Sequence, residues 1–392
     1  MFDCIIIGAG PAGLMAAIKS SQNNKVLLID KNSKPGKKLL LTGGGRCNLT
    51  NLKTNNEFLN EVNYNKKYLY SAINIFGPNE IYNYFETRNV PLKIEEDNKV
   101  FPESNQSVDV LNVLLNELKN VPQNYNETVL EIKNAKIKEV VTNKNIYQTK
   151  NIIIATGGSS FKYTGSTGDN MKFAHMLKQP TIKLFPAETG VKLIEQTYLA
   201  GTSILEVTIY FENKKSTGNL MFTHLGLGGS AIMKLSEFIY KSSNKDIKID
   251  LLPNFSKEEL LTIINNYNSE KNITSLLNNY FTKKFSLYLV NKININKRIK
   301  SLTKTEKEII INILKELRFE IKEVNELETA YVTGGGIDLK YINSMTMEST
   351  INRGIYFIGE ALDTHGPIGG YNITLALSTG YLAGLSINKE DL

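Results

Sequence analysis

Hydrophobic and polar positions at the start of the chain predict a strand, a tight turn, a helix and a second strand. Apolar residues occupy positions 4–7, and apolar residues at helical spacing occupy positions 14–18. The sequence GAGPAG at 8–13 lies between them, and a second apolar run at 26–29 ends at Asp30. This order predicts the opening unit of a parallel sheet, and therefore an α/β fold of the Rossmann type.

The spacing of the glycines in GAGPAG has a mechanical reason. Gly8 allows the sharp turn, Gly10 lets backbone amides approach a pyrophosphate, and Gly13 lets the helix pack close to the strand. The helix N-terminus then faces the phosphates, and the Asp30 carboxylate would accept hydrogen bonds from an adenosine ribose. The pattern predicts a dinucleotide site, with a glycine-rich turn without ligand as the alternative.

A second glycine-rich loop follows Asp30. Three glycines at 43–45 leave the backbone bare before Arg46 and Cys47. Backbone amides and a guanidinium in this arrangement are suited to a flat or anionic ligand. A flexible surface loop is the alternative.

The next hundred residues mix helices with short strands. Residues 65–120 are predicted to be mostly helical, with a hairpin interruption at 93–102. Alternation from 128 to 149 predicts short antiparallel strands. They lead to NIIIAT at 151–156, predicted as a short buried parallel strand that the glycine pair 157–158 closes. Such a strand would return the chain to the central sheet beside the cofactor, and an ordinary buried strand with a turn is the alternative.

From residue 186 the pattern of hydrophobic and polar residues becomes typical of strands and then of helices. Strands are predicted at 190–194, 203–211 and 218–222, with a helix at 231–240. Two capping boxes, at Ser256 and Thr303, open helices in the block that follows. The chain returns to strands at 320–333.

The C-terminal segment carries the second strong signal. An apolar strand at 354–358 ends at Gly359 and Glu360, and a glycine-rich loop leads into a helix at 373–385. An acid at the end of a late strand can bind the ribityl hydroxyls of a flavin. A helix N-terminus aimed at the isoalloxazine would stabilise the negative charge that reduction places there. Both ends of the chain are therefore predicted to meet on one flavin.

Length and composition bound the class of protein. A chain of 392 residues predicts two or three domains, and 41% hydrophobic with 22% charged residues is typical of a soluble globular protein. No apolar run is long enough to span a membrane, so we expect a cytoplasmic protein without membrane contact. Cys4 and Cys47 cannot form a disulfide framework, which fits a reducing compartment. No metal site is predicted.

The net charge of +7 favours anionic partners, although a genome-wide bias towards Lys, Asn and Ile would also explain it. One cluster of cations stands out near the N-terminus. Its members are Lys31, Lys34, Lys37, Lys38, Arg46 and Lys53. Two uses stay open for it, namely contact with the cofactor's phosphates and an RNA-facing patch.

Nine motifs together carry a resemblance to a known family. They are GAGPAG (8–13), KKLLLTGGGRCNLTN (37–51), VFPES (100–104), IIATGGSS (153–160), GSTGD (165–169), MFTHLGLGGSAI (221–232), VTGGG (332–336), TMES (346–349) and GEALDTHGPIGGYN (359–372). Over nearly its whole length the chain resembles the bacterial FAD-dependent flavoproteins called aminoacetone-oxidase-like or bile-acid-4,6-reductase-like. It departs from the family's commonest forms in VTGGG for VTAGG and in GLGGSA for GLSGPA, and neither change alters a titratable group.

The resemblance implies three domains. They are a discontinuous Rossmann-type FAD-binding domain at 1–187 and 350–392, an inserted β-barrel-like domain at 188–254 and 308–349, and a small helical domain at 255–307. The resemblance also implies a set of FAD contacts. The predicted cofactor-binding residues are Gly8, Gly10, Ala12, Gly13, Asp30, Lys31, Lys38, Arg46, Gly157, Gly158, Gly359, Glu360, Gly370, Tyr371 and Asn372.

The reaction is less constrained than the cofactor, because similar proteins are linked to amine oxidation, to reduction of conjugated C=C bonds in steroids, and to reduction of uracil in ribosomal RNA. Reduction of an activated C=C bond needs a hydride from the flavin and a proton from a nearby acid. The candidate acids are Cys47 and His365. Arg46 and the loop amides would favour a Cys47 thiolate. The alternatives are a small packing residue for Cys47 and a solvent-facing turn residue for His365.

The sequence has no second strand–GxGxxG–helix unit for a nicotinamide cofactor. Either NAD(P)H docks transiently on the flavin, which implies a reductase, or the substrate supplies the electrons, which implies an oxidase. We expect an NAD(P)H-using FAD-dependent reductase of a conjugated C=C bond, with uracil in 23S ribosomal RNA as the favoured substrate and dihydrouridine as product. The alternatives are an aminoacetone-type amine oxidase producing hydrogen peroxide and a flavin-binding ribosome-associated protein.

Overall fold

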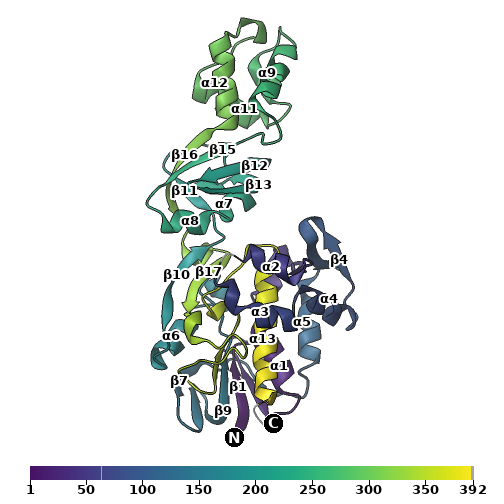
Figure 1. The fold of residues 1–392 in the computed structure, drawn as a ribbon, viewed down its shortest axis with the longest axis vertical. Coiled ribbons are helices and arrows are strands. Elements are labelled where there is room, and N and C mark those ends of the chain that lie inside the picture. The colour runs from purple at the N-terminus through teal and green to yellow at the C-terminus, as the bar shows by residue number, and fades with distance from the viewer. Residues whose placement is uncertain (63, 390–392) are drawn as a thin grey trace. The chain divides into compact units, whose positions relative to one another are not determined.

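The computed structural model describes residues 1–62 and 64–389. The chain divides into two compact units, each described by itself below (Figure 1). Unit 1 is formed by Met1–Phe185 and Tyr331–Leu392, and unit 2 is formed by Pro186–Ala330. Both ends of the chain therefore belong to the same unit. The predicted α/β class with a Rossmann-type domain and an inserted barrel is confirmed.

Unit 1 is built on a seven-stranded sheet within the described residues, with strand order β6-β2-β1-β9-β8-β7 and β18 paired to β9. Its strands are β1 (Phe2–Ile7), β2 (Val26–Ile29), β6 (Gln123–Asn124), β7 (Val129–Lys133), β8 (Lys138–Thr142), β9 (Ile146–Ile154) and β18 (Ile355–Phe357). β1 pairs in parallel with β2 and β9, and β9 pairs in parallel with β18. This is the predicted parallel core.

The strand β9 corrects one prediction. Residues 146–149 and 151–156 were expected to form two strands, but Ile146–Ile154 is one continuous strand. Its first half pairs with β8 in antiparallel register, and its second half pairs in parallel with β1 and β18. Neither Gly nor Pro lies between the halves, and the backbone stays extended while its partners change. The antiparallel hairpins and the parallel core are therefore parts of one sheet.

Smaller elements of unit 1 surround the sheet. A three-stranded sheet has the order β3 (Thr50–Asn51), β5 (Lys99–Pro102) and β4 (Leu92–Glu95), which places the predicted hairpin at 93–102. β10 (Thr181–Ala187) pairs with β17 (Val332–Ile337). The α-helices are α1 (Pro11–Ser20), α2 (Asn55–Glu61), α3 (Tyr70–Ile75), α4 (Pro78–Glu86), α5 (Ser107–Asn116), α6 (Asp169–Met176) and α13 (Tyr371–Lys389). The 3₁₀ turns are η1 (Leu39–Gly45), η2 (Lys66–Tyr68), η3 (Glu96–Asn98), η4 (Lys162–Thr164), η7 (Leu339–Tyr341) and η8 (Gly359–Ala361).

The first and last helices of the chain, α1 and α13, lie side by side (Figure 1). Two glycines of α13 permit this approach. A Cβ atom at Gly380 would stand 2.3 Å from the Ala12 carbonyl oxygen, and one at Gly384 would stand 2.7 Å from the Ala16 carbonyl oxygen. Backbone therefore packs directly on backbone, which fixes the C-terminal helix against the N-terminal glycine loop.

Unit 2 contains a closed barrel with the strand order β11-β14-β13-β12-β15-β16. Its strands are β11 (Val191–Leu193), β12 (Ser203–Phe211), β13 (Lys214–Phe222), β14 (Gly226–Gly228), β15 (Asp246–Asp250) and β16 (Leu317–Val324). The strand β14 was not predicted, because a GLG segment has no alternating pattern, and pairing with β11 and β13 forms it. The predicted helix at 231–240 is two helices, α7 (Ser230–Met233) and α8 (Ser236–Lys241).

A bundle of helices completes unit 2. Its members are α9 (Lys257–Asn266), α10 (Ile273–Leu277), α11 (Lys283–Ile293) and α12 (Lys304–Lys315). The 3₁₀ turn η5 (Ile299–Ser301) lies between α11 and α12, and η6 (Leu327–Thr329) follows β16. Both predicted capping boxes are present, at the starts of α9 and α12. The boundaries that split barrel from bundle stay a prediction, since both lie in one unit. No helix of the described chain is long and apolar enough to cross a membrane.

We expect Gly380→Ala to destabilise the protein by about 1–3 kcal/mol, because the added methyl group would collide with the backbone of α1. Helix propensity alone predicts the opposite sign, a gain of about 1 kcal/mol. Thermal and denaturant unfolding of the purified variant measure the difference. An unchanged or raised unfolding temperature would contradict the close packing of α1 on α13.

Candidate functional site

Four strand ends converge on one edge of the unit 1 sheet. Gly8 follows β1, Asp30 follows β2, Gly157 lies beyond the end of β9, and Gly359 lies beyond the end of β18. Because β2, β1, β9 and β18 run in parallel, these four positions meet at the carboxyl edge. This edge is where open α/β sheets bind their ligands.

The glycine loop after β1 combines two tight positions with one open position. Gly8 has φ +109°, and a Cβ atom there would stand 2.4 Å from the Ala155 carbonyl oxygen. A Cβ atom at Gly13 would stand 1.8 Å from the Gly8 carbonyl oxygen. At Gly10, by contrast, nothing lies within 4 Å of such an atom. The loop therefore packs against the sheet at two glycines and leaves free space at the third.

That free space lies at the start of α1. Gly10 is the N-cap of this helix and has no side chain to cap it, so the first backbone amides are left for another acceptor. Asp30 supports the loop, since the Ala9 amide donates to Oδ2 at 2.6 Å and the Asn32 amide donates to Oδ1 at 2.7 Å. Each carboxylate oxygen keeps a second lone pair for a ribose hydroxyl.

A polar cluster surrounds Glu360 at the other half of the edge. Lys38 Nζ lies 2.6 Å from Glu360 Oε2 and donates to the Ser160 hydroxyl at 2.7 Å. The Gly158 amide donates to Oε2 at 3.4 Å, and the Thr333 amide donates to Oε1 at 3.1 Å. Three other segments of the chain therefore meet on the Glu360 carboxylate. We call these five residues the Glu360 cluster.

The sequence identified only three members of this cluster as site residues, and it missed Ser160 and Thr333. The Thr333 hydroxyl accepts from the Ser159 amide at 2.8 Å and from the Ser160 amide at 3.1 Å. A Cβ atom at Gly158 would stand 2.4 Å from this hydroxyl, so glycine is required for the contact. The signal was present in the motifs IIATGGSS and VTGGG, whose hydroxyl residues adjoin glycines.

Arg46 lies apart from the Glu360 cluster. Its guanidinium donates to both carboxylate oxygens of Glu95, at 2.9 and 3.2 Å, and stacks 4.0 Å from the centre of the Phe101 ring. The guanidinium holds the pKa of Glu95 below its ordinary value. Arg46 thus ties the glycine loop 43–45 to the β4–β5 hairpin, and its role towards FAD stays a prediction.

The expected Cys47 thiolate is wrong for this structure. Cys47 is fully buried, and burial raises the pKa of its thiol to about 12. The neighbouring guanidinium is engaged by Glu95, so it does not offset the loss of hydration. Cys47 is therefore a neutral thiol at physiological pH.

His365 is buried as well, with 4% of its surface exposed, so the alternative of a solvent-facing turn residue is excluded. Its ring centre lies 6.0 Å from that of Tyr64, on which it stacks, and 6.0 Å from that of Phe185, which it meets edge to face. Asn372 holds the same loop, because its Oδ1 accepts from the Gly366 amide at 3.0 Å and its Nδ2 donates to the Gly366 carbonyl at 2.8 Å. The predicted residue Asn372 therefore fixes the backbone beside His365.

The remaining predicted residues are placed by close packing. A Cβ atom at Gly370 would stand 2.4 Å from the Thr50 carbonyl carbon, and one at Gly359 would stand 2.8 Å from the Ala12 side chain. Tyr371 is buried and stacks on Phe58 with ring centres 4.7 Å apart. A Cβ atom at Gly157 would meet the Ser166 hydroxyl at 3.0 Å. These packing contacts determine the shape of the sheet edge independently of any ligand.

The N-terminal cation cluster is mostly neutralised. Lys31 pairs with Asp169 at 2.7 Å, Lys38 with Glu360, Arg46 with Glu95, and Lys53 with Glu61 at 3.1 Å. Lys37 donates to the Asn32 side chain at 3.0 Å. Acidic partners inside unit 1 thus engage most of these charges, which removes the support for an RNA-facing patch here.

The residues at this edge fit a flavin adenine dinucleotide. The open space at Gly10 and the uncapped start of α1 suit a pyrophosphate. The Thr156 hydroxyl, just beyond β9, is buried and has no hydrogen-bond partner among the described residues. The same is true of the side-chain oxygen Oδ1 of Asn48, just after the second glycine loop. Buried polar atoms without partners are costly, and a polar ligand would satisfy them.

Comparison with known proteins identifies a family and relatives that this chain resembles. The family model described as the HI0933-like protein Rossmann domain matches residues 2–386. A ribosomal RNA dihydrouridine synthase of Haemophilus influenzae is 32% identical, covering 98% of both chains. A 3-dehydro-bile acid delta(4,6)-reductase of Clostridium scindens is 26% identical, covering 97% of both chains. A flavocytochrome c3 fumarate reductase structure aligns with a TM-score of 0.54 at 14% identity, covering 100% of this chain and 78% of that chain.

The parallel sheet, the glycine loop and the strand-end acids thus define an FAD-dependent oxidoreductase of the Rossmann type. The chain belongs to the HI0933-like Rossmann-domain family. The resemblance inferred from its motifs is confirmed.

We expect Gly10→Ala to lower the affinity for FAD by at least about tenfold, since a methyl group would occupy the space through which the pyrophosphate reaches the α1 amides. The fold should persist, because Gly10 has φ −81° and ψ 179° and no neighbour within reach. Fluorescence titration of apoprotein with FAD measures the affinity.

The matched control is Gly13→Ala, whose methyl group would collide with the Gly8 carbonyl and disturb the fold itself. Unchanged FAD affinity in Gly10→Ala would contradict the assignment of the loop.

Proposed function

We propose that this protein is an NAD(P)H-using reductase that converts uridine to dihydrouridine in 23S ribosomal RNA. The observation that carries the proposal is the 32% identity with the Haemophilus influenzae ribosomal RNA dihydrouridine synthase across 98% of both chains. Because the alignment covers almost all of both chains, it includes both units of this protein.

The reaction adds two electrons and two protons to the C5=C6 bond of uracil. NAD(P)H is oxidised to NAD(P)⁺ and gives up a hydride, and the second proton comes from an acid of the protein. Bound FAD would supply the chemistry that takes up the hydride from NAD(P)H and passes it to the base. The protein's own task is to hold the cofactor and deliver the proton.

We propose that different residues along the sheet edge hold different parts of the cofactor. The α1 amides at Gly10 would hold the pyrophosphate, and Asp30 would hold the adenosine ribose. The Glu360 carboxylate, oriented by Lys38 and the Thr333 amide, would accept hydrogen bonds from ribityl hydroxyls. The start of α13 would stabilise negative charge on the reduced ring system.

Two residues are candidates for the proton donor. The raised pKa of Cys47 keeps its thiol protonated at neutral pH, which is the form that donates. His365 lies in an aromatic pocket on a loop that Asn372 fixes, which restricts where its ring can point. The remaining predicted FAD contacts act as backbone or packing positions in this proposal.

A second candidate function is reduction of a conjugated C=C bond in a small molecule. The observation that favours it is the 26% identity with the Clostridium scindens bile acid delta(4,6)-reductase across 97% of both chains. Both candidates use the same hydride and proton chemistry. They differ in the substrate that must reach the sheet edge.

Anaerobic mixing with NADPH or NADH should bleach the bound flavin within seconds, and unmodified 23S ribosomal RNA should then restore the oxidised spectrum. Mass spectrometry of the RNA should detect dihydrouridine, which should also be missing from the ribosomal RNA of a deletion strain. Reoxidation by an unsaturated steroid but not by RNA would favour the second candidate. A flavin that an amine reduces and NAD(P)H does not would point to an oxidase and overturn both.

Cys47→Ala and His365→Ala distinguish the proton donors. The variant that lacks the donor should show reoxidation by RNA slowed by about 10²–10⁴-fold, with normal FAD content and normal reduction by NAD(P)H. Stopped-flow absorbance measures the two half-reactions separately. A residue whose replacement leaves the reoxidation rate unchanged has no part in the proton transfer.

A further inference from the structure

The excess positive charge of the chain is concentrated in the helical bundle of unit 2. Residues 255–307 contain ten Lys and Arg against four Asp and Glu, a net charge of +6, whereas the whole chain carries +7. A genome-wide preference for Lys would raise the charge everywhere. The remainder of the chain is instead close to neutral, so the charge of the bundle is a local feature.

Two segments of the bundle bring several of these cations together. Residues 269–273 and 297–304 are joined by backbone hydrogen bonds and by an isolated antiparallel bridge between Asn272 and Arg298. The bonds run from the Ile273 amide to the Lys297 carbonyl (3.0 Å), from the Ile299 amide to the Lys271 carbonyl (3.0 Å), and from the Lys300 amide to the Ser269 carbonyl (3.1 Å). We call this paired surface the basic ledge.

Five exposed cations lie on the basic ledge against one acid of its own, Glu270. The cations are Lys271, Lys297, Arg298, Lys300 and Lys304. Glu270 pairs with both Arg298 and Lys300, and Glu306 pairs with Lys297. Lys271 and Lys304 have no ion-pair partner in the part of the chain that the structure describes. The two short segments therefore carry a net charge of +4, which becomes +3 when Glu306, two residues beyond the ledge, is counted.

The ion pairs of the basic ledge do not prevent it from binding another anion. The cations that pair with Glu270 are 49% and 59% exposed, and Lys297 is 51% exposed. Exposed pairs such as the two that Glu270 makes contribute at most about 1 kcal/mol, so a phosphate can replace this carboxylate at little cost. In the Lys31–Asp169 and Lys38–Glu360 pairs of unit 1, in contrast, no side chain is more than 28% exposed.

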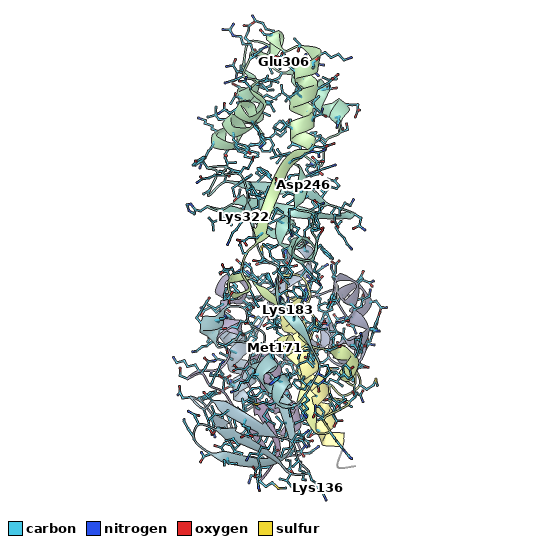
Figure 2. The ribbon with its side chains drawn as sticks, turned by 90° about the vertical axis from the view of Figure 1, so that its left-hand side faces the viewer. Lys136, Met171, Lys183, Asp246, Glu306 and Lys322 are labelled. Carbon is cyan, nitrogen blue, oxygen red and sulfur yellow. The ribbon has the colours of Figure 1, made fainter. Side chains whose placement is uncertain are left out.

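The basic ledge lies at the end of unit 2 that is far from the barrel. The helix α12 begins at Lys304 in the ledge and ends at Lys315, and the barrel strand β16 begins two residues later. Figure 2 shows Glu306 at one end of this unit, while Asp246 and Lys322 mark the barrel strands. Exposed amide side chains at Asn268, Asn272 and Asn296 add hydrogen-bond donors beside the cations.

We propose that the basic ledge binds the phosphate backbone of RNA, which rests on the proposed function in taking ribosomal RNA as the substrate. Clustered Lys and Arg neutralise phosphates and release counterions, and this supplies sequence-independent affinity. Asparagine amides can contact phosphate oxygens and sugars, which positions the RNA without selecting its sequence. The ledge thus holds the RNA, and the sheet edge of unit 1 carries out the reduction.

The test compares two triple variants with the same change of charge. Lys271→Gln, Lys300→Gln and Lys304→Gln remove three cations from the ledge. The control, Lys136→Gln, Lys172→Gln and Lys215→Gln, removes three exposed lysines from elsewhere in the chain. Binding of unmodified 23S ribosomal RNA transcript to the FAD-loaded protein is measured by filter retention over a range of salt concentrations.

The ledge variant should bind RNA at least about tenfold more weakly near 0.15 M salt, and its plot of log affinity against log salt should be shallower by about two units. The control should stay within about twofold of the unaltered protein. Equal losses in both variants, or none in the ledge variant, would overturn the proposal. So would a ledge variant that loses binding to phosphatidylglycerol vesicles while keeping its affinity for RNA.

Dihydrouridine is measured in the same samples, so that the two proposals can fail separately. If the unaltered protein forms dihydrouridine and the ledge variant does so equally well at limiting RNA, the ledge proposal fails and the proposed function stands. If the unaltered protein binds RNA through the ledge but forms no dihydrouridine, the ledge stands and the proposed function fails. Absence of any RNA binding overturns the ledge.

Discussion

The parallel pairing of β9 with both β1 and β18 is the constraint on which the candidate site depends. It places the ends of strands near residues 7, 154 and 357 at one edge of the sheet. The glycine loop and Glu360 therefore meet although most of the chain lies between them. The close packing of α1 on α13, through Gly380 and Gly384, strengthens the same arrangement from the helical side. Unit 2 is inserted between β10 and β17, two strands that pair with each other.

The distribution of charge separates two kinds of cation. In unit 1, Lys38 and Glu360 form a pair of which only 25% and 21% of the side chains are exposed, and amides and a hydroxyl complete its hydrogen bonds. Loss of either partner would leave a charge with little water to replace it. In the bundle, the cations are about half exposed, and their pairs can open at little cost. The first kind of cation builds the site, and the second kind is available to a polyanionic partner.

Much of the fold could be predicted where local sequence has a direct mechanical meaning. GAGPAG, the two capping boxes and the strand–Gly–Glu sequence at 354–360 each form the expected structure. The continuous strand β9 and the short strand β14 could not be predicted, because a strand's length and existence depend on partners distant in sequence. The cluster's Ser160 and Thr333 were missed for the same reason, since their contacts span more than 170 residues.

The sequence by itself determined the class of fold, the family and the position of the glycine loop, because these follow from residue spacing within short segments. Tertiary structure decided how the charged and polar groups are used. It engaged Arg46 with Glu95, buried Cys47 as a neutral thiol, and buried His365 beside two aromatic rings. A charge or a thiol acquires its chemical state from its neighbours and from its access to water, and neither can be read from its place in the chain.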